Sequence, residues 1–411
     1  MLSRGGRPAL LAALCCAAVL VLPSGAARAD VIRSQQQWVL SLMDVQAAWQ
    51  VTMGAGVTVA VLDSGVNGDV SDLSGSVING KDYTDAGTAP ASPNWGVHGT
   101  WMTSLIAGHG HDNGLDGVIG IAPASRVLSI RVIPDRADPH YGKYEHEPET
   151  RIQQSLANGI RFAVQYGAKV ISMSIGYGAP SATVRQALQY AYSHGVVVVA
   201  SAGNSGGSTD ADQQGQSPES FPADYPGVIS VAAVNSSGVV ATFSSANLSV
   251  DVAAPGVSVP AQGRDGQYWF VSGTSPACAL VAGVAALIKS KYPNLAPDLV
   301  VSALTSTTTG RPARGYDGQR GFGIVDAAAA LTKAGLLVRE RPRASSIAAR
   351  TVFGGGPLLP DPVSPRSSGP LILFSLLALI SLTLVTVGGT RLVTRRVREG
   401  QATARGPQVP W

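Results

Sequence analysis

Ser275 is placed in this 411-residue chain as the nucleophile of an enzyme would be. It follows the apolar stretch 269–271 and opens a segment, 276–288, that is apolar on nearly all sides of a predicted helix. The start of a helix offers unpaired backbone N–H groups and partial positive charge, which suit a developing oxyanion. A serine hydroxyl alone is a weak nucleophile and needs a base that a third group orients.

Residues suited to both partner roles stand next to predicted elements. The β-branched run 57–62 predicts a buried strand of a parallel sheet, with Asp63 at its carboxyl end, where sites of open α/β sheets lie. His98 precedes a small-residue helical stretch, and imidazole is the usual base near neutral pH. We expect Ser275 to attack a carbonyl carbon, His98 to take its proton and Asp63 to fix the imidazole tautomer.

Asn204 is the predicted oxyanion donor. It follows the buried strand predicted at 196–200 and lies between His98 and Ser275 in the chain. Its side-chain amide is expected to donate to the oxyanion together with the backbone N–H of Ser275.

Three other interpretations of these residues must be considered. Asp63 is also a residue that commonly begins a turn, and Ser275 one that commonly caps a helix. A metal site would draw on the histidines and the aspartate of the same region, but their spacing does not place three ligands on one helix face. We therefore expect no metal ion at these four residues: His98, His109, His111 and Asp112.

The remaining pattern alternates strands and helices, which predicts an α/β fold with a parallel sheet covered on both faces. Segments 67–96 and 134–149 are polar and are predicted to be loops, the second an exposed one. Further strands are predicted at 126–133, 169–175, 227–234 and 250–253, and helices at 150–166 and 181–194.

The chain ends carry targeting signals. Residues 1–29 combine basic residues, an apolar run and an A-x-A motif, which is typical of a secretory signal peptide. Residues 370–390 hold about 20 uncharged residues, enough to span a bilayer, and the Arg-rich segment 391–411 then predicts a cytoplasmic tail. A Pro-, Ser- and Gly-rich linker is predicted at 339–369. Because the tail is predicted to be cytoplasmic, the main domain is expected outside the cell membrane.

Charge and cysteine content narrow the function classes further. The formal net charge of +4 partly reflects Arg-rich ends and gives no reason to expect a nucleic-acid partner. Cys15 and Cys16 lie in the signal segment, so a mature chain retains only Cys278 and has no internal disulfide.

Four segments together resemble the subtilisin-like serine proteases, peptidase family S8. They are Val59-Ala60-Val61-Leu62-Asp63-Ser64-Gly65-Val66, His98-Gly99-Thr100, Ser201-Ala202-Gly203-Asn204 and Gly273-Thr274-Ser275, in the family's order of Asp, His, Ser. The resemblance implies a subtilisin-like three-layer fold over 57–338, with a seven-stranded, mostly parallel sheet. It also implies endopeptidase activity on proteins or peptides, with Ser174, Ile175 and Gly176 along the substrate backbone.

The wider layout resembles the mycosins, membrane-anchored subtilisin-like proteases of actinobacterial type VII secretion systems. This resemblance implies that 30–56 is an extension packed on the protease domain, and that the secretion membrane complex and its substrates are partners. No cofactor is expected; calcium is common in the wider family, but no dense Asp/Asn loop marks a site here. The alternative is a catalytically silent scaffold of such a complex.

Overall fold

The computed structural model describes residues 29–111, 114, 116–145, 149–208 and 215–339. The chain divides into two units, Met1–Pro357 and Leu358–Trp411, and all described residues belong to the first. The predicted signal peptide, linker, membrane span and tail lie almost entirely outside the described residues. Within the part of the chain that is described, no helix is both long and apolar enough to cross a membrane.

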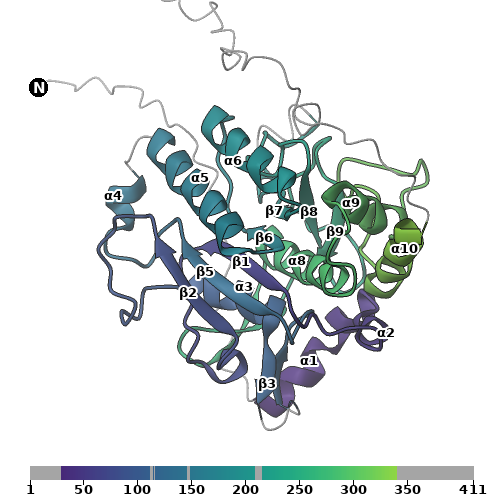
Figure 1. Ribbon diagram of the computed structural model, residues 1–411, viewed down its shortest axis with the longest axis horizontal. Helices are drawn as coiled ribbons and strands as arrows, with labels where there is room; N and C mark the ends of the chain where they lie inside the picture. Colours follow the sequence, from purple (N-terminus) through teal and green to yellow (C-terminus); the bar gives the residue numbers. More distant parts are fainter. Residues whose placement is uncertain (1–28, 112–113, 115, 146–148, 209–214, 340–411) are drawn as a thin grey trace, which may run out of the picture. The chain divides into compact units, whose positions relative to one another are not determined.

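A seven-stranded sheet forms the centre of this unit (Figure 1). Its order is β2-β5-β1-β6-β7-β8-β9, and every neighbouring pair is parallel, which confirms the predicted α/β class. The strands are β1 (Thr58–Asp63), β2 (Val77–Asp82), β5 (Arg126–Arg131), β6 (Val170–Met173), β7 (Val197–Ser201), β8 (Val228–Val234) and β9 (Val252–Pro255).

Helices cover both faces of the sheet (Figure 1). Successive side chains of a strand point to opposite faces, and because the central strands are largely apolar, both faces must be buried. The main helices are α3 (Val97–Ala107), α5 (Glu149–Tyr166), α6 (Ala182–Ser193), α8 (Thr274–Lys291), α9 (Pro297–Ser306) and α10 (Ala327–Arg339). In β1, Val59 and Val61 pack in one hydrophobic core with residues of α3 and α8, whereas Ala60 and Leu62 pack in another with residues of α5 and α6.

The N-terminal segment packs against the domain as two helices, α1 (Ala29–Leu42) and α2 (Val45–Trp49). Val39 and Met43 are fully buried in the core shared with α3 and α8. Gln36 is also fully buried and exchanges two hydrogen bonds with the backbone of Ile119, at 2.7 Å and 3.0 Å. These contacts join α1 to a small hairpin of β3 (His109–His111) and β4 (Asp116–Ile119).

Two loop predictions were wrong. Segment 67–96 contains a 3₁₀ turn, η1 (Ser71–Leu73), and the edge strand β2, whose exposed polar sequence VINGKD lacks the apolar run of a buried strand. Segment 134–149 is not simply an exposed loop: it holds the short helix α4 (Tyr141–Glu145), and Asp138 is buried against Arg131 at 2.6 Å. A second hairpin, β10 (Val259–Gln262) and β11 (Tyr268–Val271), was also not predicted.

Candidate active site

The predicted site residues gather at one edge of the sheet. Asp63 is the last residue of β1, Ser174 directly follows β6, and Asn204 stands three residues after the end of β7. These three strands are neighbours in the sheet, so their carboxyl ends lie side by side. His98 and Ser275 are each the second residue of a helix, α3 and α8.

Asp63 and His98 form a pair in which the aspartate is buried and the histidine is partly exposed. Nδ1 of His98 lies 2.8 Å and 2.9 Å from the two carboxylate oxygens of Asp63, and the Asp63 side chain is only 1% exposed. Burial lowers the pKa of His98 while the Asp63 carboxylate raises it, and the net result is a pKa above the ordinary 6.5. This arrangement holds the proton on Nδ1 and leaves Nε2 to act as a base.

The pair depends on a close approach between α3 and the turn after β1. A Cβ placed on Gly99 would lie 2.1 Å from the carbonyl oxygen of Gly65. The amide of Gly99 donates to the hydroxyl of Ser64 at 3.1 Å. Glycine is therefore required next to His98, because any side chain would push the histidine away from Asp63.

Asn204 is held in one orientation by Thr274, the first residue of α8. Its Oδ1 accepts hydrogen bonds from the backbone N–H and the hydroxyl of Thr274, both at 2.9 Å. A flipped amide would set N–H groups against N–H, so the oxygen must face Thr274. The Nδ2 group is thus turned to the other side, where it has no hydrogen-bond partner among the described residues.

The Ser275 hydroxyl, like Asn204 Nδ2, is one of several buried polar atoms without a hydrogen-bond partner within the described ranges. It is therefore not hydrogen-bonded to His98 in this structure, so the link between the predicted nucleophile and the predicted base is not formed. Such bonds are often long in ligand-free enzymes and tighten when substrate binds. The carbonyl oxygen of Ser275 accepts from the Ser174 hydroxyl at 3.2 Å, which ties the start of α8 to the end of β6.

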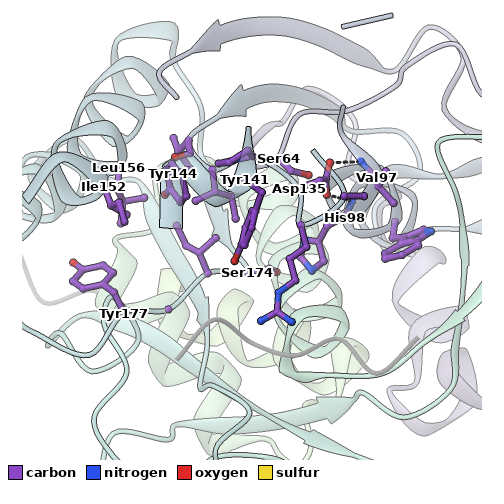
Figure 2. A pocket seen from close by; sticks show the side chains of 18 residues that line it. Ser64, Val97, His98, Asp135, Tyr141, Tyr144, Ile152, Leu156, Ser174 and Tyr177 are labelled. Atoms are coloured by element: carbon purple, nitrogen blue, oxygen red, sulfur yellow. Dashed lines mark hydrogen bonds between the residues drawn. The ribbon is translucent and has the colours of Figure 1, made fainter. Parts of the chain in front are cut away.

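Ser174, Ile175 and Gly176 line a cavity of about 260 Å³ that opens beside His98 (Figure 2). Trp101 also lines this cavity and meets the His98 ring edge-on at 6.4 Å between centroids, whereas Met102 is buried in the core. The wall is largely apolar and includes side chains of the wrongly predicted loop and of α5: Pro134, Ala137, Tyr141, Tyr144, Ile152 and Leu156.

The histidines of the metal interpretation do not come together with His98. His109 bonds to the carbonyl oxygens of Gly110 and Ser74, and His111 bonds to Asp72 at 2.7 Å. Asp112 lies outside the described residues. Where the chain is described, no three His, Cys, Asp or Glu side chains are grouped to hold a metal ion.

Two contributors to the site were missed in the sequence. Thr274 reads there only as part of the serine motif, yet its side chain orients Asn204. Asp135 falls in a polar segment that looks like a surface loop, yet it is 6% exposed and bonds to backbone amides at the start of α3. No local pattern marks Asp135, because its partners lie 37 and 38 residues earlier in the chain.

The fold and this arrangement agree with a match to a known family. Residues 54–323 match the family model of the subtilase family, Peptidase S8. The chain belongs to the subtilase family, a family of serine endopeptidases, as predicted.

Individual members of the family are similar to this chain in sequence or in structure. Fervidolysin of Fervidobacterium pennivorans is 34% identical over 325 residues, which cover 72% of this chain but only 44% of fervidolysin. Subtilisin DY of Bacillus licheniformis is 36% identical over 280 residues, covering 67% of this chain and 92% of that protein. The solved structure of the MycP3 protease from the type VII (ESX-3) secretion system matches with a TM-score of 0.61 and 31% identity, covering 78% of this chain and 92% of MycP3. The predicted likeness to the mycosins is thus confirmed.

Proposed function

We propose that this chain is a serine endopeptidase with Ser275 as nucleophile, His98 as general base and Asp63 as the group that orients it. One observation carries the proposal: among several buried polar atoms without hydrogen-bond partners in the described structure, the Ser275 hydroxyl and Asn204 Nδ2 belong to groups that meet at the N-terminus of α8, where Asn204 is bonded to Thr274. Buried polar atoms are rarely unpaired unless a ligand or a reaction uses them.

The reaction follows from these positions. Ser275 Oγ attacks the carbonyl carbon of the peptide bond while His98 Nε2 accepts the hydroxyl proton. The tetrahedral oxyanion takes hydrogen bonds from Asn204 Nδ2 and the backbone N–H of Ser275, at the positive end of α8. His98 then gives the proton to the leaving amine, and water repeats the sequence to release the acid and restore the serine. Asp63 stabilises the imidazolium in both halves.

The cavity beside His98 suggests the class of peptide that binds. Ser174, Ile175 and Gly176 form one side and supply backbone groups for an extended chain. The other walls are apolar and aromatic, so we infer that an apolar side chain of the substrate occupies this space.

A fluorophosphonate probe tests the nucleophile, because it labels only an activated serine. The full chain is purified in three forms: wild type, Ser275→Ala, and the control Ser290→Ala, which removes a hydroxyl from the far end of the same helix. We expect wild type and Ser290→Ala to be labelled and Ser275→Ala to remain unlabelled. A folded wild-type chain that is not labelled would contradict the proposal and favour a silent scaffold.

We also propose that residues 370–390 anchor the chain in the cell membrane, with the catalytic domain outside and the tail in the cytoplasm. The support is the uncharged length of the segment and the arginines that follow it. Because the matched MycP3 protease comes from a type VII secretion system, we propose such a membrane complex and its exported proteins as partners. Carbonate extraction of membranes should retain the full chain and release a chain that ends at residue 357; release of both would refute the anchor.

A further inference from the structure

The helix that carries His98 has no cap of its own. Its N-cap residue, Gly96, has a left-handed backbone with φ 76° and offers no side-chain oxygen to the first amides of α3. A Cβ at this position would lie 2.9 Å from the carbonyl carbon of Gly65, so Ser, Asp or Thr would not fit there without a shift. The amides at the start of α3 must find their acceptor elsewhere in the fold.

Asp135 supplies that acceptor from a different part of the chain. Its Oδ2 accepts from the backbone N–H of Val97 at 2.7 Å, and its Oδ1 accepts from the backbone N–H of His98 at 3.0 Å. Figure 2 shows the Asp135 carboxylate beside Val97 and His98, with both bonds dashed. Because one carboxylate grips the amides of two successive residues, it fixes both the position and the direction of the first turn.

We propose that Asp135 is a positioning residue for the base: it sets the place of His98 through the start of α3 and adds a second negative charge to the surroundings of the imidazolium. The inference rests on the proposed function, in which His98 takes and returns the proton. Asp63 orients the ring through its side chain, whereas Asp135 holds the backbone from which the ring projects.

The charges around His98 affect the pKa of its imidazole. Both carboxylates raise the pKa of His98 against the effect of burial, Asp63 more than Asp135. Burial in turn raises the pKa of Asp135, against the lowering effect of its two amide bonds. Titratable or charged groups from several elements face this region in the described structure: Asp63 from β1, Asp135 and Arg136 from the loop after β5, Tyr141 and Tyr144 from α4, Tyr177 from the segment after β6, Arg264 from the β10–β11 hairpin and the neutral thiol of Cys278 from α8.

Asp135 also joins the base to the substrate cavity. The segment 133–137 lines that cavity, and so does His98. A change in this wall therefore reaches the base directly through the two amide bonds. A carboxylate that only stabilised the fold would not transmit a change in the cavity wall to the position of the imidazole.

The test is the pKa of His98 measured by NMR in the full chain, with ¹⁵N-labelled histidine and Ser275→Ala to prevent self-cleavage. Asp135→Asn removes the charge and one acceptor oxygen; Asp135→Ser is the second variant and keeps one small acceptor. Asp44→Asn is the control, because Asp44 is exposed, makes no capping bond and has a left-handed backbone that asparagine tolerates. The pH profile of peptide hydrolysis is measured in parallel with Ser275 present, per labelled active site.

We expect Asp135→Asn to lower the pKa of His98 by about half a unit or more, and the acidic limb of kcat/KM to move with it. We expect kcat to fall about 5- to 50-fold while KM changes less than about threefold, since the base and not the binding surface is displaced. Asp44→Asn should match wild type in each measurement.

The outcomes separate this inference from the proposed function. An unchanged His98 pKa in both Asp135 variants overturns the positioning role, whatever the activity. A lowered pKa without a matching shift of the acidic limb shows that His98 is not the base, and the proposed function then fails. If Asp135→Asn loses only thermal stability, Asp135 is a structural cap and the inference is wrong.

Discussion

Replacing Asn204 by alanine removes the side-chain donor that we propose for the oxyanion. The Nδ2 group has no competing partner in the described residues, and its amide cannot flip without losing both bonds from Thr274. Its stabilisation is therefore available only when negative charge develops on the substrate. Such an interaction acts on the transition state and not on the bound peptide.

The expected size is large. Loss of a single oxyanion-hole donor costs about 10²–10³ in kcat, or about 2.7–4 kcal/mol, a magnitude known from subtilisin, a relative of this chain. KM should change little, because the ground-state carbonyl is not yet charged. Asn204→Ala also leaves two donors of Thr274 unpaired, so we expect the free energy of unfolding to fall by about 1–3 kcal/mol and a smaller fraction of the molecules to be active. Rates must therefore be divided by the fraction of sites that a fluorophosphonate probe labels.

A second substitution tests how Asn204 is held. Thr274→Val removes the hydroxyl bond to Asn204 and leaves the backbone bond, so we expect kcat to fall about 3- to 30-fold. In the double variant the loss should be about that of Asn204→Ala alone, because Thr274 acts through the amide that is no longer present. Fully additive losses would show that Thr274 contributes by another route.

The control is Asn235→Ala. Like Asn204, Asn235 accepts two hydrogen bonds through its Oδ1, here from the backbone N–H groups of Ser237 and Val239, but it lies in the loop after β8 and not among the proposed site residues. It should lower stability without changing kcat. If Asn204→Ala keeps kcat within about threefold of wild type, against the loss expected for an oxyanion donor, Nδ2 does not face the oxyanion and the reasoning is refuted.

Three further predictions concern pH and stability. Because the pKa of His98 is raised, pH–rate profiles should show kcat/KM increasing with pH around an apparent pKa above 6.5. Asp63→Asn should shift this apparent pKa to lower pH and reduce kcat by about 10³–10⁴. Burial raises the pKa of Asp251 from 3.8 to about 6, so the folded state loses up to about 3 kcal/mol as pH rises through this range. Asp251→Asn should thus raise the Tm at pH 8 but not at pH 4; an equal gain at both would contradict this. Gln36→Ala should lower the free energy of unfolding by about 2–5 kcal/mol, because it unpairs the buried N–H and C=O of Ile119, whereas the exposed Gln37→Ala should not.

The sequence predicts the frame of this site well because the frame depends on simple patterns. Buried parallel strands are continuous apolar runs, and the polar residue after such a run stands at the edge where the other strand ends meet. Asp63 and Asn204 were found in this way, and the structure places Asp63 at the end of β1 and Asn204 shortly after β7. The edge strand β2 was missed for the converse reason, since it is polar and mostly exposed.

Contacts made through backbone amides leave no such trace in the sequence. Asp135 and Thr274 orient the two groups on which the proposed chemistry depends, but their partners are an amide 37 residues away and a side chain 70 residues away. Nothing in the neighbourhood of either residue indicates which partner it will meet, because that is set by the crossing of strands and helices. The motifs indicate the reacting groups, but they do not indicate the contacts of Asp135 and Thr274 that hold those groups in place. We therefore expect hydrolysis by this chain to depend on Asp135 and Thr274, although each lies far in the sequence from the residue that it orients.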